Sequence, residues 1–160
     1  NVFPDFDYCA VAAGTAVLSA NNIAFTPQFG SRQRYHMIIT DAKIEASPII
    51  EKDICDNCGK CAKACPLGAI SFEESEKIDI CGRKMTVAKI DYKLCSHCQN
   101  GAVSNRFSDK AKPDRIAALC NRTCLCHLEE SKLIGNLFEN EFRQSKPWAK
   151  DYFGKNVKID

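Results

Sequence analysis

The chain has 160 residues, of which 45% are hydrophobic and 26% charged, with 22 basic against 20 acidic side chains. This is the composition of a soluble globular chain, long enough for one ordinary domain or two small ones. No apolar run approaches the length of a membrane span. The formal charge of +2 is too small to predict a nucleic-acid partner.

Residues 1–50 differ in composition from the rest of the chain. The small apolar side chains of residues 9–14 predict a short buried helix that ends at Gly14. Two short apolar runs follow, at 16–18 and 23–25, separated by a polar turn. Residues 34–40 then predict a strand that becomes buried.

Several polar or reactive side chains of this first segment are ambiguous. Arg32 and Arg34 are candidates to bind a phosphate or carboxylate of a cofactor, because guanidinium groups suit such anions. The alternative is a solvated strand end. We interpret His36 as a strand residue and Cys9 as a small core residue.

The middle of the chain carries the spacing C-x2-C-x2-C-x3-C-P, formed by Cys55, Cys58, Cys61 and Cys65 with Pro66. Bacterial ferredoxins use this spacing to hold a 4Fe–4S cluster, and in two-cluster ferredoxins the fourth cysteine serves the other cluster. The alternatives are a zinc site or free core cysteines. Eleven cysteines would suggest a disulfide scaffold in a shorter secreted chain, but here the spacing indicates metal ligation and a reducing, cytoplasmic compartment.

The cysteine segment is partly duplicated 40 residues later. Cys55 and Cys58 align with Cys95 and Cys98, whereas the third and fourth cysteines align with Gly101 and Asn105. A second cluster therefore needs ligands from elsewhere in the chain.

Candidates for these ligands occur in the sequence 119–127. Cys120 and Cys124 are spaced i and i+4, so on a helix both thiols face one side. Pro113 and Asp114 are expected to start that helix, with Asp114 as its cap. Cys126 competes as a ligand.

Between the two halves, residues 69–72 and 85–90 predict short strands that would shield the clusters from water. Cys81 precedes a predicted turn at Gly82 and is expected to be a spare thiol, although it also competes as a ligand. His97 and His127 are expected on the surface, although either imidazole could replace a thiolate.

The last segment, 129–160, is expected to open with an amphipathic helix and to end in a strap or tail. Its apolar residues recur at three- and four-residue steps: Leu128, Leu133, Ile134, Leu137, Phe138 and Phe142.

A family resemblance rests on several of these features together. The loop from Phe25 to Gly30, the pair Arg32 and Arg34, the sequence Ile-Ile-Thr-Asp at 38–41 and the cysteine box 55–66 follow in this order. This succession of motifs resembles the C-terminal half of the epoxyqueuosine reductase and reductive dehalogenase group. Members of that group join a corrinoid-binding α/β domain to a two-cluster ferredoxin module.

The resemblance implies an α+β fold, in which a ferredoxin-like two-cluster iron–sulfur module follows the end of an α/β domain. Residues 1–50 would be the remnant of the corrinoid domain, 51–128 the ferredoxin-type domain, and 129–160 the C-terminal helix and tail. The cofactors would be two 4Fe–4S clusters and, under this resemblance, a corrinoid.

The crossed arrangement of ferredoxins predicts the two ligand sets. The first cluster would take Cys55, Cys58, Cys61 and one cysteine of the 120–126 group, with Cys124 preferred. The second would take Cys65, Cys95, Cys98 and Cys120.

Three functions follow from these predictions. The leading one is electron transfer through two 4Fe–4S clusters to a redox partner protein or a linked reductase domain. The second is the iron–sulfur half of a corrinoid-dependent oxidoreductase, for which a tRNA is a possible substrate. The third is a metal-stabilised structural or sensing module.

Overall fold

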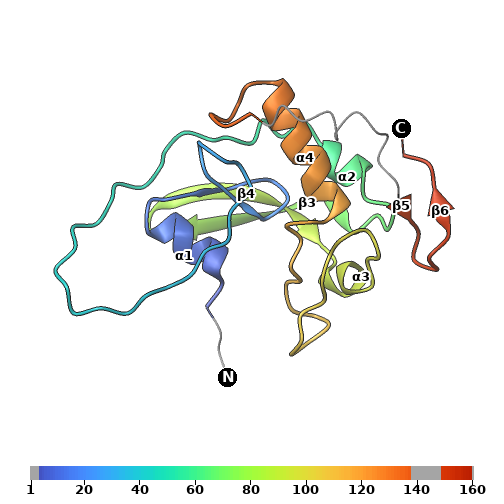
Figure 1. Ribbon diagram of the computed structural model, residues 1–160, viewed down its shortest axis with the longest axis horizontal. Coiled ribbons are helices and arrows are strands. Elements are labelled where there is room, and N and C mark those ends of the chain that lie inside the picture. The colour runs from blue at the N-terminus through green and yellow to red at the C-terminus, as the bar shows by residue number, and fades with distance from the viewer. Residues whose placement is uncertain (1–3, 138–148, 160) are drawn as a thin grey trace.

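The computed structural model describes residues 4–137 and 149–159 (Figure 1). The elements follow in the order α1 (Phe6–Ala12), β1 (Val17–Leu18), β2 (Ala24–Phe25), α2 (Lys60–Lys63), β3 (Ile70–Ile80), β4 (Arg83–Ile90), α3 (Tyr92–Ser96), α4 (Leu119–Glu130), β5 (Ala149–Lys150) and β6 (Asn156–Val157). The strands form three antiparallel pairs, β1–β2, β3–β4 and β5–β6. The predicted mixture of helices and strands is confirmed.

The first segment folds largely as its sequence predicts. Asp5 caps α1 by accepting a 3.0 Å hydrogen bond from the backbone N–H of Asp7. The helix ends at Ala12, and Gly14 follows with φ of +70°. The apolar runs 16–18 and 23–25 contain β1 and β2, which are joined by a tight turn in which the Ser19 hydroxyl donates to the carbonyl of Ile23 (2.8 Å).

The predicted buried strand over residues 34–40 is wrong. This stretch is extended but pairs with no strand among the described residues. Ile38 and Ile39 are 86% and 93% exposed. Figure 1 shows the chain between β2 and α2 leaving the body beside α1 as a long excursion, so the β-branched residues find no neighbour to pair with or pack against.

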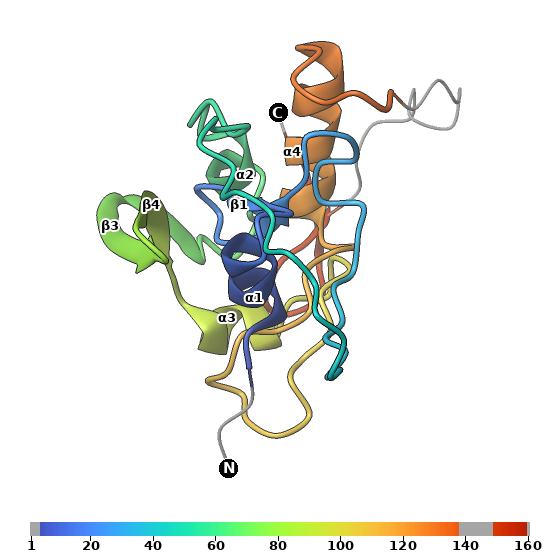
Figure 2. The same ribbon diagram turned by 90° about the vertical axis from the view of Figure 1, so that its left-hand side faces the viewer.

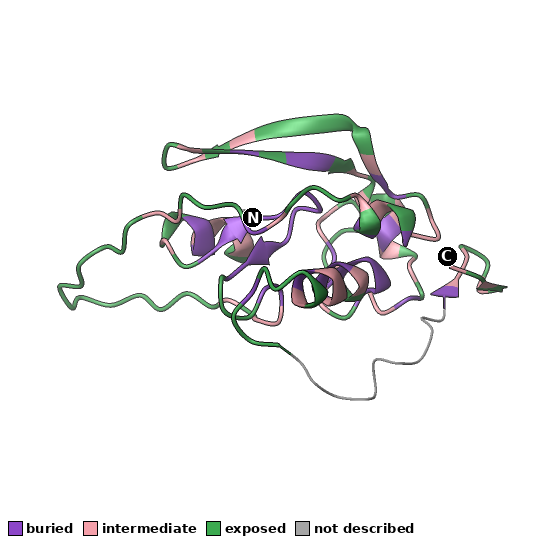
Figure 3. Cartoon of the chain, turned by 90° about the horizontal axis from the view of Figure 1, so that it is seen from above, coloured by how far each residue is buried: buried purple, intermediate pink, exposed green. Residues whose placement is uncertain are grey.

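The strands predicted at 69–72 and 85–90 are present, as parts of the longer strands β3 and β4. Their turn is formed by Cys81 and Gly82, with φ of +52° and +85°, the backbone that two-residue hairpins favour. Figures 2 and 3 show the hairpin as an outer layer, with α1 and the β1–β2 pair between it and α4. Most of β3 is exposed, whereas β4 buries Met85, Val87 and Ala88.

Two clusters of buried side chains hold these layers together. One lies where α1, β1 and β2 meet the distal half of the hairpin, and it contains Val11, Leu18 and Val87. The other joins residues of β1 and β2 to α2, α4 and the base of the hairpin, and it contains Phe25, Leu125 and Leu128. The second cluster also includes buried cysteines, which makes it the setting of the candidate site.

The helix α4 begins later than its sequence predicts, and the helix expected after it is absent from the described residues. Asp114 does not cap it, because the helix starts at Leu119 with Ala118 at the cap position. The Asp114 carboxylate instead accepts from the backbone N–H of Ile116 (3.1 Å). The helix ends at Glu130, and Lys132 follows with φ of +54°. The expected helix through Leu133 to Leu137 is therefore wrong, and the expectation for Phe138 and Phe142 lies outside the described residues.

Within the described ranges, none of the helices combines the length and the apolar character that crossing a bilayer requires.

Replacing Gly14 by alanine should destabilise the fold, because a Cβ at this position would lie 2.3 Å from the backbone oxygen of Pro48. The positive φ alone costs about 1–2 kcal/mol, and overpacking adds about 1–3 kcal/mol. The control is Gly82→Ala, which has φ of +85° but nothing within 4 Å of its Cβ. Urea unfolding followed by circular dichroism should show the larger loss for Gly14→Ala; equal losses would contradict the close approach of Pro48.

Candidate metal centre

Cysteines from distant parts of the sequence meet where α2 packs against α4 (Figure 1). Gly59, with φ of +72°, turns the cysteine loop into α2, which carries Cys61. Cys120 and Cys124 lie four residues apart on α4, so both point to the same side of the helix. All three thiols are buried in one hydrophobic cluster.

We call Cys55, Cys58, Cys61 and Cys124, which the sequence predicts as one ligand set, the first group. Burial, followed by the charges of Cys120, Cys55 and Cys58, raises the pKa of Cys61 to about 12. Burial also raises the pKa of Cys124, and the charges of Cys61, Cys55 and Cys58 act in the same direction. Cys61 and Cys124 belong to the same buried cluster.

We call Cys65, Cys95, Cys98 and Cys120, which the sequence predicts as the other ligand set, the second group. Burial is the main cause that raises the pKa of Cys95 to about 12; the Arg115 guanidinium opposes this rise, and Cys65, Cys120 and Cys98 add to it. Burial likewise raises the pKa of Cys120, which the Arg115 guanidinium lowers and the charges of Cys65 and Cys98 raise. Cys61 of the first group and Cys120 of the second belong to one buried cluster.

Backbone N–H groups point at sulfur in both groups. The N–H of Ala20 donates to Cys55 Sγ at 3.5 Å, which places the β1–β2 turn against the first group. In the second group, the N–H of Ala69 donates to Cys65 Sγ and that of Asn100 to Cys98 Sγ, both at 3.4 Å. Donors of this kind favour a charged, ligating sulfur over a neutral thiol.

The structure explains why the second half of the duplication lacks two cysteines. A Cβ at Gly101 would lie 2.3 Å from the backbone oxygen of Ala117, so no cysteine fits there. The Asn105 side chain stabilises its own loop, because its Oδ1 accepts a hydrogen bond from the backbone N–H of Phe107 (2.9 Å).

Neither predicted ligand set includes the other three cysteines. Cys81 is exposed in the hairpin turn, as expected of a spare thiol. Cys9 is half-buried and lines a cavity of about 840 Å³. Cys126 is half-buried on α4.

The guanidinium groups of Arg32 and Arg34 each bind a carboxylate of the chain itself. Arg32 pairs with Glu129 of α4 at 2.7 Å, and Arg34 pairs with Asp114 at 2.6 Å. Arg34 is the more exposed of the two, and it lines a second cavity of about 860 Å³. Binding of an anionic cofactor by this pair stays a prediction.

Three features of the site have no clear signal in the sequence. Arg115 is buried, with 3% of its surface exposed, and Asn100 is fully buried. His127 is only 13% exposed in its side chain, and its Nε2 lies 2.7 Å from Asp56 Oδ2, so it is less of a surface residue than expected. Asp56, Cys58 and His127 place possible ligand atoms within 4.8 Å of one another, but this set shares Cys58 with the first group.

Comparison with known proteins supports iron–sulfur binding. Residues 48–71 match the 4Fe-4S binding domain family. Tetrachloroethene reductive dehalogenases of Desulfitobacterium hafniense and Dehalobacter restrictus are 35% identical over 72 residues, which is 43% of this chain and 13% of each relative. An epoxyqueuosine reductase of Listeria monocytogenes is 29% identical over 122 residues, 66% of this chain and 32% of that protein. No solved structure matches the chain.

These matches confirm the resemblance drawn from the sequence and the assignment of a 4Fe–4S binding motif. The chain spans no more than about a third of the length of these relatives. The similarity to reductases supports a role in electron transfer.

Replacing Asn100 by alanine should release the C-terminal hairpin. The Asn100 side chain donates to the carbonyl of Lys150 (2.7 Å) and accepts from its N–H (2.5 Å). Losing these bonds and leaving both Lys150 groups unpaired should cost about 1–3 kcal/mol. Hydrogen exchange at residues 149–157 should accelerate in Asn100→Ala but not in Asn156→Ala, which removes an exposed amide from the same hairpin. Unchanged exchange in both variants would contradict the clamp.

Proposed function

We propose that this chain holds two 4Fe–4S clusters and passes single electrons through them to a redox partner or a linked reductase domain. The observation that carries the proposal is the packing of α2 against α4, which buries Cys61, Cys120 and Cys124 in one cluster with Cys65 packed against it. The ligands proposed for one cluster are Cys55, Cys58, Cys61 and Cys124. Those proposed for the other are Cys65, Cys95, Cys98 and Cys120.

The donor set fits such clusters. A 4Fe–4S cluster takes four thiolates, and each group offers four. Because burial raises the pKa of Cys61, Cys95, Cys120 and Cys124, these thiols hold their protons in the absence of metal. Ligation must therefore release protons, which favours tight binding only at neutral or higher pH.

The surrounding residues supply what an electron carrier needs from its protein. Ile54, Leu125 and Leu128 are buried beside the cysteines and keep bulk water away. The backbone donors of Ala20 and Ala69 fix the orientation of the ligands. When bound, each cluster would accept and release one electron at a time. The adjoining groups would keep the electron's path between them short.

A second candidate is the iron–sulfur half of a corrinoid-dependent reductase. It is supported by the similarity to an epoxyqueuosine reductase and to reductive dehalogenases. The cavity of about 860 Å³ that Arg34, Lys112 and Arg115 line offers positive charge to an anionic cofactor or substrate, although Asp5 and Asp7 already pair with Lys112. A tRNA substrate belongs to this candidate alone.

Metal analysis after anaerobic reconstitution tests the ligand sets. The unaltered chain should contain about eight iron and eight sulfide. Cys124→Ala and Cys98→Ala each remove a ligand from one group, so each variant should lose about four of both. The control, Cys81→Ala, removes an exposed thiol of the hairpin turn and should keep the full content.

Two outcomes would contradict this proposal. Loss of iron in Cys126→Ala but not in Cys124→Ala would place the ligand at Cys126. Stoichiometric zinc without sulfide, in a chain that stays folded and shows no reducible signal, would favour a structural or sensing module.

Absorption spectroscopy tests the corrinoid candidate. Reconstitution with a cobalamin, followed by removal of unbound cofactor, should leave corrinoid bands beside the broad cluster absorption. Arg34→Gln should weaken this retention, whereas Arg106→Gln, which removes an exposed charge from the loop before Lys112, should not. Cluster absorption alone, in the unaltered chain, would count against corrinoid binding by this chain.

A further inference from the structure

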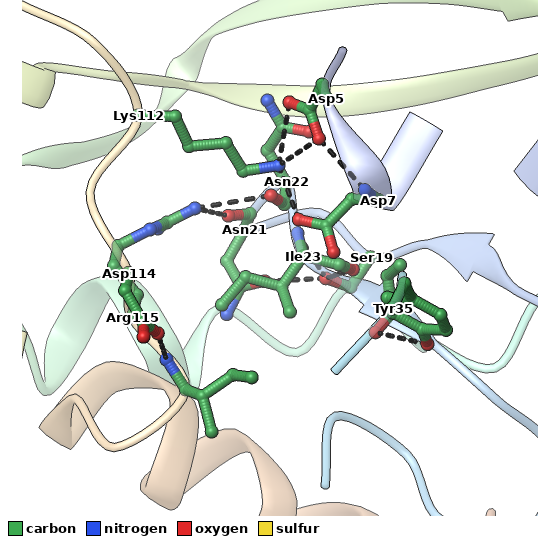
Figure 4. Close-up of polar contacts among 12 residues, drawn as sticks. Asp5, Asp7, Ser19, Asn21, Asn22, Ile23, Tyr35, Lys112, Asp114 and Arg115 are labelled. Carbon is green, nitrogen blue, oxygen red and sulfur yellow. Dashed lines mark hydrogen bonds and ion pairs between the residues drawn. The ribbon is translucent and has the colours of Figure 1, made fainter. Parts of the chain in front are cut away.

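Arg115 is a cation enclosed within the fold. It lies between the β1–β2 turn and the start of α4, and only 3% of its surface is exposed. Figure 4 shows its guanidinium reaching the turn, where Nη2 donates to the backbone oxygen of Asn21 (2.6 Å) and to that of Asn22 (3.3 Å). No carboxylate of the described residues forms an ion pair with it.

The hydrogen bonds of Arg115 leave part of its guanidinium unsatisfied. Its Nε and Nη1 atoms are buried and have no hydrogen-bond partner within residues 4–137 and 149–159. The ring of Tyr92 lies 5.9 Å from the guanidinium carbon and stabilises the charge without accepting these hydrogens in a conventional bond. A buried charge without compensation is strongly destabilising, so a negative group should lie within its reach.

The second group of cysteines would supply that negative charge once its members ligate as thiolates. Tyr92, whose ring faces the Arg115 guanidinium, begins α3, and Cys95 lies one turn later on the same helix. Arg115 also comes shortly before Cys120, which lies in the first turn of α4. In agreement with this placement, Arg115 lowers the pKa of both Cys95 and Cys120. The first group has a carboxylate beside it, because Asp56 accepts from the backbone N–H of Cys58 (3.3 Å) and also pairs with His127 (2.7 Å).

We propose that the buried Arg115 guanidinium raises the reduction potential of the cluster held by Cys65, Cys95, Cys98 and Cys120 above that of the other cluster, so that electrons move from the first cluster to the second. This rests on the proposed function, since it requires both clusters. A fixed positive charge stabilises the reduced, more negative form of a neighbouring cluster, and the low dielectric of a buried site strengthens the effect. Arg115 is a positioning residue in this scheme, because it sets where the electron resides.

A redox titration of the reconstituted protein, followed by electron paramagnetic resonance, tests the inference. The unaltered protein should show two resolved midpoints. Arg115→Gln should lower the midpoint potential of one cluster by at least about 59 mV, which corresponds to a tenfold change in the equilibrium constant of a one-electron couple. Arg115→Lys keeps the charge and should retain most of the original value. Arg106→Gln, an equal charge loss at an exposed site, should leave both midpoints unchanged.

Asp56→Asn provides the complementary variant, because removing the anion beside the first group should raise the other midpoint and narrow the gap. A single shared midpoint in the unaltered protein would overturn the inference without any variant. So would unchanged midpoints in an Arg115→Gln protein that keeps about eight iron. Absence of iron from the unaltered protein would instead overturn the proposed function, so the two failures are distinguishable.

Discussion

The packing of α2 against α4 is the contact on which the rest of the structure depends. It brings Cys61 beside Cys120 and Cys124, which are separated from it by the entire β3–β4 hairpin and α3. The thiols of these helices are buried together with Leu125 and Leu128, so the proposed metal ligation and the hydrophobic packing would share one core. Residues of the first segment complete this core, because Val17 and Phe25 pack into it and the N–H of Ala20 reaches Cys55.

The charges around the two groups of thiols are distributed unevenly. Each group has two buried cysteines, yet the Arg115 guanidinium acts on the second group and the Asp56 carboxylate on the first. Desolvation alone would affect both in the same direction, so it cannot distinguish them. The difference comes from the loop before α4, which carries Arg115, and from the cysteine loop itself, which carries Asp56. These are the short segments where a change of sequence could alter the electronic properties without changing the fold.

Local features were predictable from the sequence, and features that depend on distant contacts were not. The cysteine spacing, the i and i+4 pair on α4 and the turn at Cys81 and Gly82 all follow from rules that act over a few residues. The strand expected over 34–40 failed because its β-branched residues have no described partner. The cap expected at Asp114 failed because its carboxylate pairs with Arg34 and with the N–H of Ile116. The burial of Arg115 depends on a backbone carbonyl of the β1–β2 turn, which is far away in sequence, so no local pattern predicts it.

The crossing of α2 and α4 also constrains when the protein can mature. The cysteine loop is synthesised before α4, and the fourth ligand proposed for it lies on that later helix. Until then the early cysteines are exposed to oxidation and to adventitious metals, because nothing yet covers them. Under the proposed ligand sets, insertion of inorganic iron and sulfide would therefore follow translation of α4.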